Sequence, residues 1–255
     1  MLPRTLKYAP EGIFGATFYE HGEWRNLVIK TAVTGTLRNI PYENRVYAEL
    51  QQLKGRNTGC VFMYPSHDPE SLIVEDFGTD IRQYLTPESN VLKNELVKVI
   101  SAVDALHSCG YIHGDLKPHN ILCRALQGGI FEFKLCDLDS ATKMGALFNT
   151  SKFTKRWVSP EVFQAWKTGK LLIAVASLDI FNLGVLFAAI LHDLRSSEMY
   201  LLPADTDEGL IQAFSNQPYL LSLMPCGGRG DYKVWVDKMC RYSLMSNANP
   251  ASHII

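Results

Sequence analysis

A chain of 255 residues is long enough for one large domain or two small ones, at roughly 100–200 residues each. Hydrophobic residues make up 47% and charged residues 20%, which excludes a disordered chain, and a net charge of −1 gives no electrostatic reason to expect a nucleic-acid partner. The six cysteines form no C-x-x-C pair, which favours reduced thiols in an intracellular protein, cytoplasmic with a nuclear alternative. The oligomeric state stays open.

The first 32 residues read as three strands. We expect these strands at residues 6–9, 10–19 and 26–32, with His21-Gly22-Glu23 at the tip of a hairpin between the last two. Gly12 and Gly15 would let backbone amides approach a phosphate closely, although a hairpin with glycines is more often only a hairpin. Lys30 lies in an apolar strand, where an unpaired ammonium is costly to bury, so we expect it to have an acidic partner.

A helix is predicted between Asn39 and Gly55, because Asn39 is a suitable cap and Pro41 fits the first turn. Its inward face, at helical spacing, comprises Glu43, Val46, Tyr47, Leu50 and Leu53. Glu43 is the acidic residue on that face and the expected partner of Lys30, whereas Glu49 is offset and expected to be solvated. Short strands at residues 60–64 and 71–75 complete a small lobe of five strands and one helix.

After residues 75–78 the composition shifts towards helix. We expect a helix through Leu92 and Leu106, a strand at residues 131–136, and a mobile polar segment at residues 140–155 with few core residues. The apolar stretch Leu171–Leu191 is long enough to span a bilayer, but an aspartate near mid-span costs about 2.5–3.5 kcal/mol. A buried helix from about Asp179 is therefore favoured, with no membrane insertion.

Between these helices lies Tyr111–Leu122, in which Asp115, Lys117 and Asn120 share a short irregular loop. Phosphoryl transfer needs this set, because a carboxylate orients the attacking hydroxyl, a cation offsets charge on the moving group, and an amide oxygen holds a divalent ion. The strand that follows this loop delivers Asp137 to its end. Each residue alone has a structural alternative, such as a turn former for Asn120 or a strand-end cap for Asp137.

With these pieces in order, the chain resembles a eukaryotic-type protein kinase domain over nearly its whole length. Lys117, two residues after Asp115, resembles the loop of serine/threonine-directed members. The resemblance implies one α+β domain over residues 1–255 with a two-lobed fold. The small β-sheet lobe with one helix would cover about residues 1–76, the hinge about 75–78, and the larger, mostly helical lobe about 79–255.

The resemblance also implies a site for ATP and Mg²⁺ between the lobes. The catalytic residues would be Asp115, Lys117, Lys30 and its ion-pair partner Glu43, and the metal ligands Asn120 and Asp137. The nucleotide contacts would be Gly12, Gly15, Thr17, Val28, Lys30, Val74, Glu75, Phe77 and Leu122. Thr154 would brace the catalytic loop, Ser159-Pro160-Glu161 would match A-P-E, and Asp179 would tie down the loop backbone, as in D-x-x-x-x-G.

Several positions depart from the family pattern. Pro10 replaces the first glycine of the Gly-rich loop, and Gly114 replaces the arginine of H-R-D, so we expect no dependence on a phosphorylated activation segment. Asp139 replaces the glycine of D-F-G and is expected to add a carboxylate near the metal. Asn249 falls where an arginine normally pairs with Glu161.

Three functions are compatible with these residues. The first is a serine/threonine kinase that transfers the γ-phosphate of ATP to a protein substrate. The second is a pseudokinase scaffold that keeps the fold, and is motivated by Pro10, Asp139 and Asn249. The third is a small-molecule phosphotransferase of the aminoglycoside or choline kinase type, which Gly114 fits better but the segment from Thr154 to Glu161 does not.

Overall fold

An antiparallel sheet of five strands forms the N-terminal part of the computed structural model, which describes residues 6–9, 13–20, 23–31, 39–84, 97–152, 154, 157 and 159–191. The strands are β1 (Leu6–Ala9), β2 (Ile13–Glu20), β3 (Glu23–Thr31), β4 (Met63–Tyr64) and β5 (Ser71–Glu75), in the order β1-β2-β3-β5-β4. Paired residues run from Ile13 with Lys30 to Glu20 with Glu23, so the predicted hairpin is confirmed. Pro10, Gly12 and the tip residues 21–22 lie outside the described residues.

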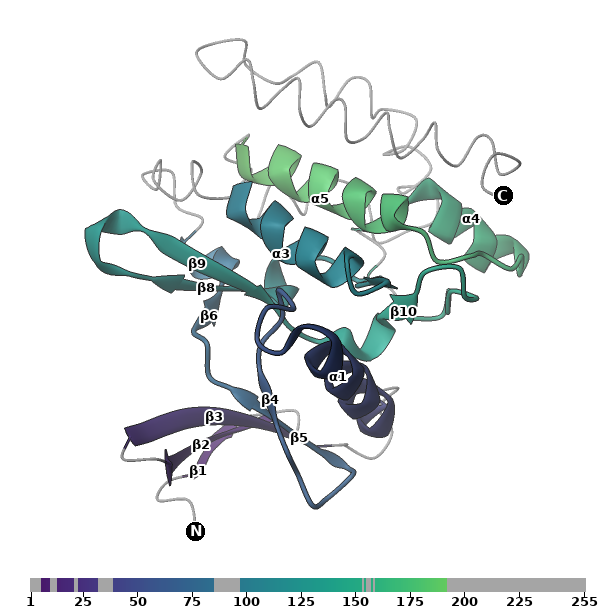
Figure 1. Cartoon of the computed structure of the whole chain (residues 1–255). Helices are drawn as coiled ribbons and strands as arrows, with labels where there is room; N and C mark the ends of the chain where they lie inside the picture. Colours follow the sequence, from purple (N-terminus) through teal and green to yellow (C-terminus); the bar gives the residue numbers. More distant parts are fainter. Residues whose placement is uncertain are drawn as a thin grey trace.

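Helix α1 (Ile40–Lys54) lies beside this sheet (Figure 1) and confirms the predicted helix. The side chain of Asn39 accepts a hydrogen bond from the Tyr42 N–H at 3.1 Å, which caps the first turn. The buried face comprises Ile40, Glu43, Val46, Tyr47 and Leu50. The prediction for Leu53 is wrong, since its side chain is 62% exposed. At about 100° per residue, ten residues place Leu53 about 80° around the helix from Glu43.

The link between α1 and β5 contacts the C-terminal part of the chain. Cys60 forms an isolated parallel bridge with Leu135, and Val61 N donates to Leu135 O at 2.9 Å. The strand predicted at residues 60–64 is therefore shortened to Met63–Tyr64, because Cys60 and Val61 pair with Leu135 and not with β5. This contact attaches the small sheet to the rest of the molecule.

The larger part combines short strands and helices. The strands β6 (Thr79–Asp80), β8 (Ile121–Ala125) and β9 (Phe131–Leu135) form one sheet, and β7 (Tyr111–Ile112) pairs with β10 (Thr142–Lys143). The helices are α3 (Val97–His107), α4 (Pro160–Thr168) and α5 (Ala176–Leu191). Short 3-10 turns are η1 (Ile81–Tyr84), η2 (Pro118–Asn120), η3 (Gln127–Gly129) and η4 (Leu138–Ser140).

The predictions for this part are mostly confirmed. The helix predicted through Leu92 and Leu106 is described from Val97, and α5 begins three residues before the predicted Asp179. Across the described part of the chain, no helix combines the length and apolar character that a membrane span requires. Cys60, Cys109, Cys123 and Cys136 are free thiols, whereas Cys226, Cys240 and Asn249 lie outside the described residues.

The described part of the polar segment 140–155 has few core residues, as predicted, but those residues make specific contacts. Ala141 and Phe148 are buried, and β10 pairs with β7. The Phe148 N–H donates to Leu172 O at 2.8 Å, and the Phe148 ring joins a second apolar cluster with Phe163 of α4. The segment therefore has fixed contacts, which its polar composition did not indicate.

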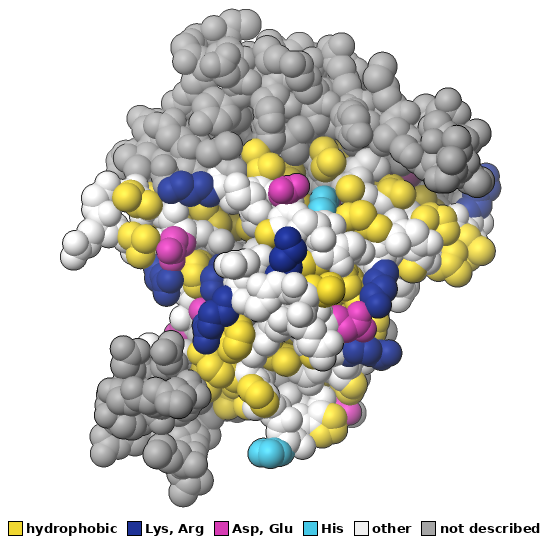
Figure 2. All heavy atoms as spheres, viewed as in Figure 1, with side chains coloured by type: hydrophobic (Ala, Val, Ile, Leu, Met, Phe, Trp, Pro, Cys, Tyr) yellow, Lys and Arg dark blue, Asp and Glu magenta, His cyan; other side chains and the backbone are white. Residues whose placement is uncertain are grey.

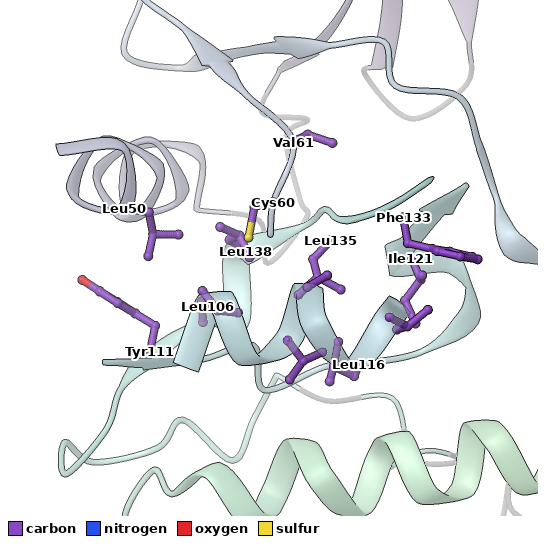
Figure 3. Close-up of a cluster of buried hydrophobic side chains, with 14 of the residues drawn as sticks. Leu50, Cys60, Val61, Leu106, Tyr111, Leu116, Ile121, Phe133, Leu135 and Leu138 are labelled. Atoms are coloured by element: carbon purple, nitrogen blue, oxygen red, sulfur yellow. The ribbon is translucent and has the colours of Figure 1, made fainter. Parts of the chain in front are cut away.

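One apolar core connects the two parts (Figure 3). Leu50 of α1, Leu106 of α3 and Leu138 of η4 point into it, together with residues of β8 and β9. Helix α3 contacts both β9 and α5, so it lies between the β6-β8-β9 sheet and the most apolar helix (Figure 1). On the face in Figure 2, basic and acidic side chains lie intermingled, without a stretch of one sign. The shared core fixes α1 relative to the loop after β7.

Candidate active site

The loop that follows β7 is held by a carboxylate from α5. Asp179 Oδ2 accepts from the His113 N–H at 2.7 Å, and Asp179 Oδ1 accepts from the Gly114 N–H at 2.9 Å. His107 Nε2 lies 2.8 Å from the same carboxylate. Burial raises the pKa of Asp179, but hydrogen bonding to His107 and nearby positive charge outweigh burial, so the pKa lies below its usual value. A buried charge in an apolar helix is thereby explained, as predicted.

Gly114 adopts a conformation that few other residues can take. Its φ is +79°, and a Cβ at this position would lie 2.7 Å from Ser140 O and 2.8 Å from Cε2 of the Phe148 ring. A larger side chain would displace both groups. The absence of the arginine of H-R-D therefore coincides with close packing of segment 140–148 against the loop.

Asp115 lies at the centre of a small polar cluster. Lys117 Nζ donates to Asp115 Oδ2 at 2.5 Å, and the Thr154 N–H donates to Asp115 Oδ1 at 3.1 Å. Lys117 Nζ also donates to Thr154 Oγ1 at 2.8 Å. Both carboxylate oxygens therefore have a donor, and the cation lies beside the carboxylate that would orient an acceptor hydroxyl. Thr154 braces the loop, as expected.

Asn120 lies within reach of the same carboxylate and of the next strand end. Its Nδ2 donates to the Asp115 carbonyl at 2.9 Å, which leaves the amide oxygen as an acceptor. The Cys136 N–H donates to the Asn120 carbonyl at 3.0 Å, so Asp137 follows directly beside Asn120. Asp137 has a φ of +64°, the one positive φ of a non-glycine residue among the described residues. Such strain is typical of functional positions.

Lys30 connects the small sheet to Asp137. Its ammonium lies 2.7 Å from Glu43 Oε2 and also contacts Asp137 Oδ1. The Leu138 N–H donates to the other Glu43 oxygen at 3.0 Å. Burial lowers the pKa of Lys30, but the carboxylates of Glu43 and Asp137 outweigh it, so the pKa is raised. The predicted partner of Lys30 is confirmed as a contact.

The two carboxylates around Lys30 differ in their pKa directions. Burial raises the pKa of Asp137, yet the Lys30 ammonium outweighs burial and the net pKa is lowered. For Glu43 burial is the larger effect, so its pKa lies above the usual value despite the ion pair. Asp137 is the more exposed of the two, with 37% of its side chain accessible against 1% for Glu43. Asp137 is therefore the carboxylate that can reach an external cation.

The expected nucleotide contacts in the small sheet lie on neighbouring strands. Gly15 of β2 pairs with Val28 of β3, and Val28 pairs with Val74 of β5. Thr17 lies further along β2, opposite Asn26, and Gly12 lies outside the described residues. Gly15, Val28 and Val74 therefore form a row across three strands.

Glu75 and Phe77 are more fully engaged than expected. Glu75 Oε1 accepts from the Phe62 N–H at 2.7 Å and contacts Lys134 Nζ. Phe77 is buried, with the cations of Arg124 and Lys134 over its ring. These contacts connect the segment between the lobes to β8 and β9, where Leu122 is partly buried.

The oxygen donors suit a magnesium ion that is bound mainly through a phosphate. Mg²⁺ takes oxygen ligands and is commonly held by one or two carboxylates together with substrate phosphates. Asp137 and Asn120 carry such oxygens on two segments that the Cys136–Asn120 backbone hydrogen bond joins. Within the residues that the structure describes, no group of three or more His, Cys, Asp or Glu forms a separate metal cage.

Two expectations about acidic residues are wrong. The carboxylate of Asp139 is not left free for a metal, because its Oδ1 accepts from Lys152 Nζ at 2.7 Å and from the Asn39 N–H at 3.1 Å. Glu49 is not simply solvated, because its Oε2 accepts from Tyr111 Oη and lies 2.7 Å from Lys143 Nζ. Both carboxylates instead connect α1 to other elements.

Sequence reasoning missed two contributors to the site. His107, in the last turn of α3, contacts Asp179, and a basic residue just before the Cys109-Gly110 helix stop was the available signal. Lys152 lies in the segment that was predicted only to be polar and mobile, and nothing in the local pattern distinguishes it. Among the described atoms, Glu161 Oε2 is buried without a hydrogen-bond partner.

Comparisons with known proteins agree with this arrangement. Residues 38–201 match the sequence profile described as Protein kinase domain. Mitogen-activated protein kinase HOG1B of Wallemia ichthyophaga is 30% identical over 157 residues, which cover 58% of this chain and 40% of the relative. Ribosomal protein S6 kinase alpha-2 of Homo sapiens is 32% identical over 139 residues, which cover 53% of this chain and 17% of the relative.

A third relative is mitogen-activated protein kinase sty1 of Schizosaccharomyces pombe, 27% identical over 157 residues, which cover 58% of this chain and 42% of the relative. The chain therefore spans about two fifths of the length of the mitogen-activated protein kinases that it matches.

Proposed function

This chain belongs to the protein kinase family, and on that premise we propose that it is a protein serine/threonine kinase that transfers the γ-phosphate of ATP to a hydroxyl of a protein substrate. The observation that carries the proposal is that Lys30, Asp137, Asn120 and Asp115 are linked through direct contacts and one neighbouring residue. Lys30 contacts Asp137, Asp137 follows the residue bonded to Asn120, and Asn120 donates to Asp115. These are the groups that phosphoryl transfer requires in one place.

In the proposed reaction Asp115 orients the acceptor hydroxyl and accepts its proton. Lys117, 2.5 Å from that carboxylate, offsets the charge that develops on the transferred group, and Thr154 holds both side chains in position. Lys30, fixed by Glu43, provides a second positive charge for the phosphates of the nucleotide. Mg²⁺, held by Asn120 and Asp137, would neutralise phosphate charge.

The backbone between the lobes supports a site for adenine. The Glu75 N–H donates to Phe62 O at 2.9 Å and the Asp76 N–H donates to Asn26 O at 3.0 Å. In the described part of the molecule, no acceptor is bonded to the Phe77 N–H. A base lying between Val28 and Leu122 would find a free backbone donor there.

The serine/threonine preference has two supports. Lys117 lies two residues after Asp115, which is typical of serine/threonine-directed loops, and the relatives named above are mitogen-activated and ribosomal protein S6 kinases. The scaffold alternative was motivated partly by Asp139, whose carboxylate is engaged by Lys152 and Asn39. The Asp139 carboxylate is therefore no obstacle to a metal-bound nucleotide.

The test is a transfer assay with Mg-ATP labelled on the γ-phosphate and generic protein substrates. Asp115→Asn should lower the rate by about 10²–10⁴-fold, as expected for loss of a general base. Lys30→Met should lower it comparably. The matched controls are Asp104→Asn and Lys170→Met, both at exposed positions outside the site, and both should behave as wild type.

Two results would contradict the proposal. One is a wild-type protein that transfers no phosphate to any protein substrate, or only to amino-sugars and amino-alcohols tested in parallel. The other is an Asp115→Asn variant as active as Asp104→Asn. A thermal shift by Mg-ATP without transfer would identify a nucleotide-binding scaffold instead.

A further inference from the structure

We propose that Asp139 is a positioning residue, whose carboxylate fastens the start of α1 to the segment 140–152 and so keeps Glu43 against Lys30. The inference rests on the proposed function of that site. We call the group of Asp139, Lys152 and the Asn39 N–H the Asp139 clasp. The clasp would hold α1 in place through the ion pair of Asp139 with Lys152 and the hydrogen bond from Asn39.

The contacts of the clasp are short and partly shielded from water. Asp139 Oδ1 accepts from Lys152 Nζ at 2.7 Å and from the Asn39 N–H at 3.1 Å. The side chains of Asp139 and Lys152 are 16% and 18% accessible, so the ion pair is less screened than one on the open surface. Asn39 is the cap of α1, where the helix dipole favours a negative charge.

Polar contacts matter here because a cleft interrupts the packing. A cavity of about 450 Å³ lies between α1 and the segment, lined among others by Tyr42, Arg45, Lys143 and Lys152. Tyr42 Oη donates to Ala141 O at 2.6 Å across this region. Figure 1 shows α1 directly beside the short turn that leads to β10. Where two surfaces do not pack continuously, such bridges add to the shared core in fixing their relative position.

The clasp can reach Lys30 because it acts on one turn of α1. Glu43 follows Asn39 by four residues, so about one helical turn separates them. The Leu138 N–H donates to Glu43 Oε1 at 3.0 Å, and the next residue, Asp139, accepts from Asn39. Two consecutive residues therefore hold the two ends of this turn, and loss of the second contact frees the turn to shift. Glu43 would then leave Lys30.

The inference differs from two simpler explanations. If Asp139 were a metal ligand, its removal would change metal dependence and not the exchange of α1 amides. If the clasp only stabilised the fold, Asp139→Asn would lower the melting temperature, and its effect on nucleotide affinity would add to that of Glu43→Gln. A positioning role predicts non-additive effects on nucleotide affinity, because Asp139→Asn and Glu43→Gln would both separate Glu43 from Lys30.

The experiment uses the full chain with Asp139→Asn, Lys152→Met and the conservative Lys152→Arg. Hydrogen exchange of peptides covering residues 39–50 is measured first without nucleotide. Asp139→Asn and Lys152→Met should speed exchange in the first turns of α1 by about threefold to tenfold, and Lys152→Arg should not. Asp104→Asn, an exposed carboxylate on α3, is the matched control and should leave exchange unchanged.

Affinity for a non-hydrolysable Mg-ATP analogue is then measured for Asp139→Asn, Glu43→Gln and the double variant. Asp139→Asn should weaken binding about threefold to tenfold, and the double variant should be no weaker than Glu43→Gln alone. Exchange in Asp139→Asn equal to that in Asp104→Asn, or fully additive losses, would overturn the inference. Because exchange needs no turnover, an inactive wild type would count against the proposed function and leave this test intact.

Discussion

Two groups of charges meet at the candidate site, and they are held in different ways. The loop at residues 113–120 is fixed by Asp179, a fully buried carboxylate that accepts two backbone N–H groups. The cluster of Lys30, Glu43 and Asp137 instead joins side chains from the sheet, α1 and the end of β9. One arrangement fixes the path of the backbone, and the other joins elements that are far apart in the chain.

The difference shows which part of the site tolerates movement. A backbone N–H bonded to a buried carboxylate cannot shift without leaving a buried polar group unsatisfied. An ion pair between side chains can follow small displacements of its elements, because the side chains have rotamer freedom. We therefore expect the loop to be rigid in all states of the protein, whereas the Lys30 cluster depends on where α1 lies.

The largest effect is expected for Asp179→Asn. An amide can accept only through its one oxygen, so a buried N–H of His113 or Gly114 loses its partner, and the destabilisation should be about 3–5 kcal/mol. Urea unfolding at neutral pH measures it, with Asp104→Asn as the control. A loss below about 1 kcal/mol would show that the loop does not need the carboxylate.

The stability difference between wild type and Asp179→Asn should depend on pH. The pKa of Asp179 in the folded protein lies below its ordinary value of 3.8, so its contribution is fully present above pH 3.8 and is lost as the pH falls through the folded pKa. The stability gap between wild type and Asp179→Asn should stay constant from neutral pH to about pH 5 and narrow below pH 3.8. Unfolding curves across that range test this, and a gap that widens in acid would refute it.

Gly114→Ala is expected to cause the next largest loss of stability. The substitution combines a positive φ with contacts of a Cβ below 3.0 Å to Ser140 O and the Phe148 ring, and we expect a loss of about 2–4 kcal/mol. Gly128→Ala is the matched control, since its φ of +78° is similar but nothing lies within 4 Å. Thermal and urea unfolding compare them. Equal losses would mean that packing against segment 140–148 contributes nothing.

A smaller loss of stability is expected for Lys30→Met. It leaves the carboxylates of Glu43 and Asp137 without their shared cation, but Asp137 is 37% accessible and can be hydrated, so we expect about 1–3 kcal/mol. Activity should fall far more than stability does. Comparing its unfolding free energy with that of Asp179→Asn tests the contrast between the two groups, which would fail if Lys30→Met were the more destabilising.

The smallest effect concerns the helix that carries Glu43. Leu53→Gln should change the unfolding free energy by less than about 0.5 kcal/mol, because the side chain is 62% exposed. Leu50→Ala, three residues earlier on the buried face, should cost about 2–5 kcal/mol and loosen α1 against the core. Chemical denaturation distinguishes them, and similar losses would place Leu53 in the core after all.

Much of the fold could be read from local patterns. Asn39, Pro41 and Gly55 predicted the bounds of α1, and the strands of the small sheet were predicted within a few residues, except residues 60–64. These features depend on caps, turns and periodicity that neighbouring residues specify. The error at Cys60 arose because its partner, Leu135, lies 75 residues further along the chain, and no local pattern identifies such a partner.

For the site, too, the residue types could be predicted from the sequence, whereas some of their partners could not. The types and order of Lys30, Glu43, Asp115, Asn120 and Asp137 indicated phosphoryl transfer before any contact was known. The partners of Asp139 and Glu49 were mistaken, because an acidic side chain outside the predicted core can bind metal, water or a lysine with equal local plausibility. Only the position of α1 above segment 139–152 decides that Asp139 contacts Lys152 and Asn39.

The sequence by itself therefore determined which chemistry the chain carries, since that depends on residue types and their spacing along one loop and one strand end. The tertiary structure decided which charges meet. Lys30 and Asp137 are 107 residues apart, and Asn39 and Asp139 are 100 apart. Contacts over such separations arise only when the shared apolar core brings α1, β3 and the end of β9 together, because burial is non-directional and does not specify partners in advance.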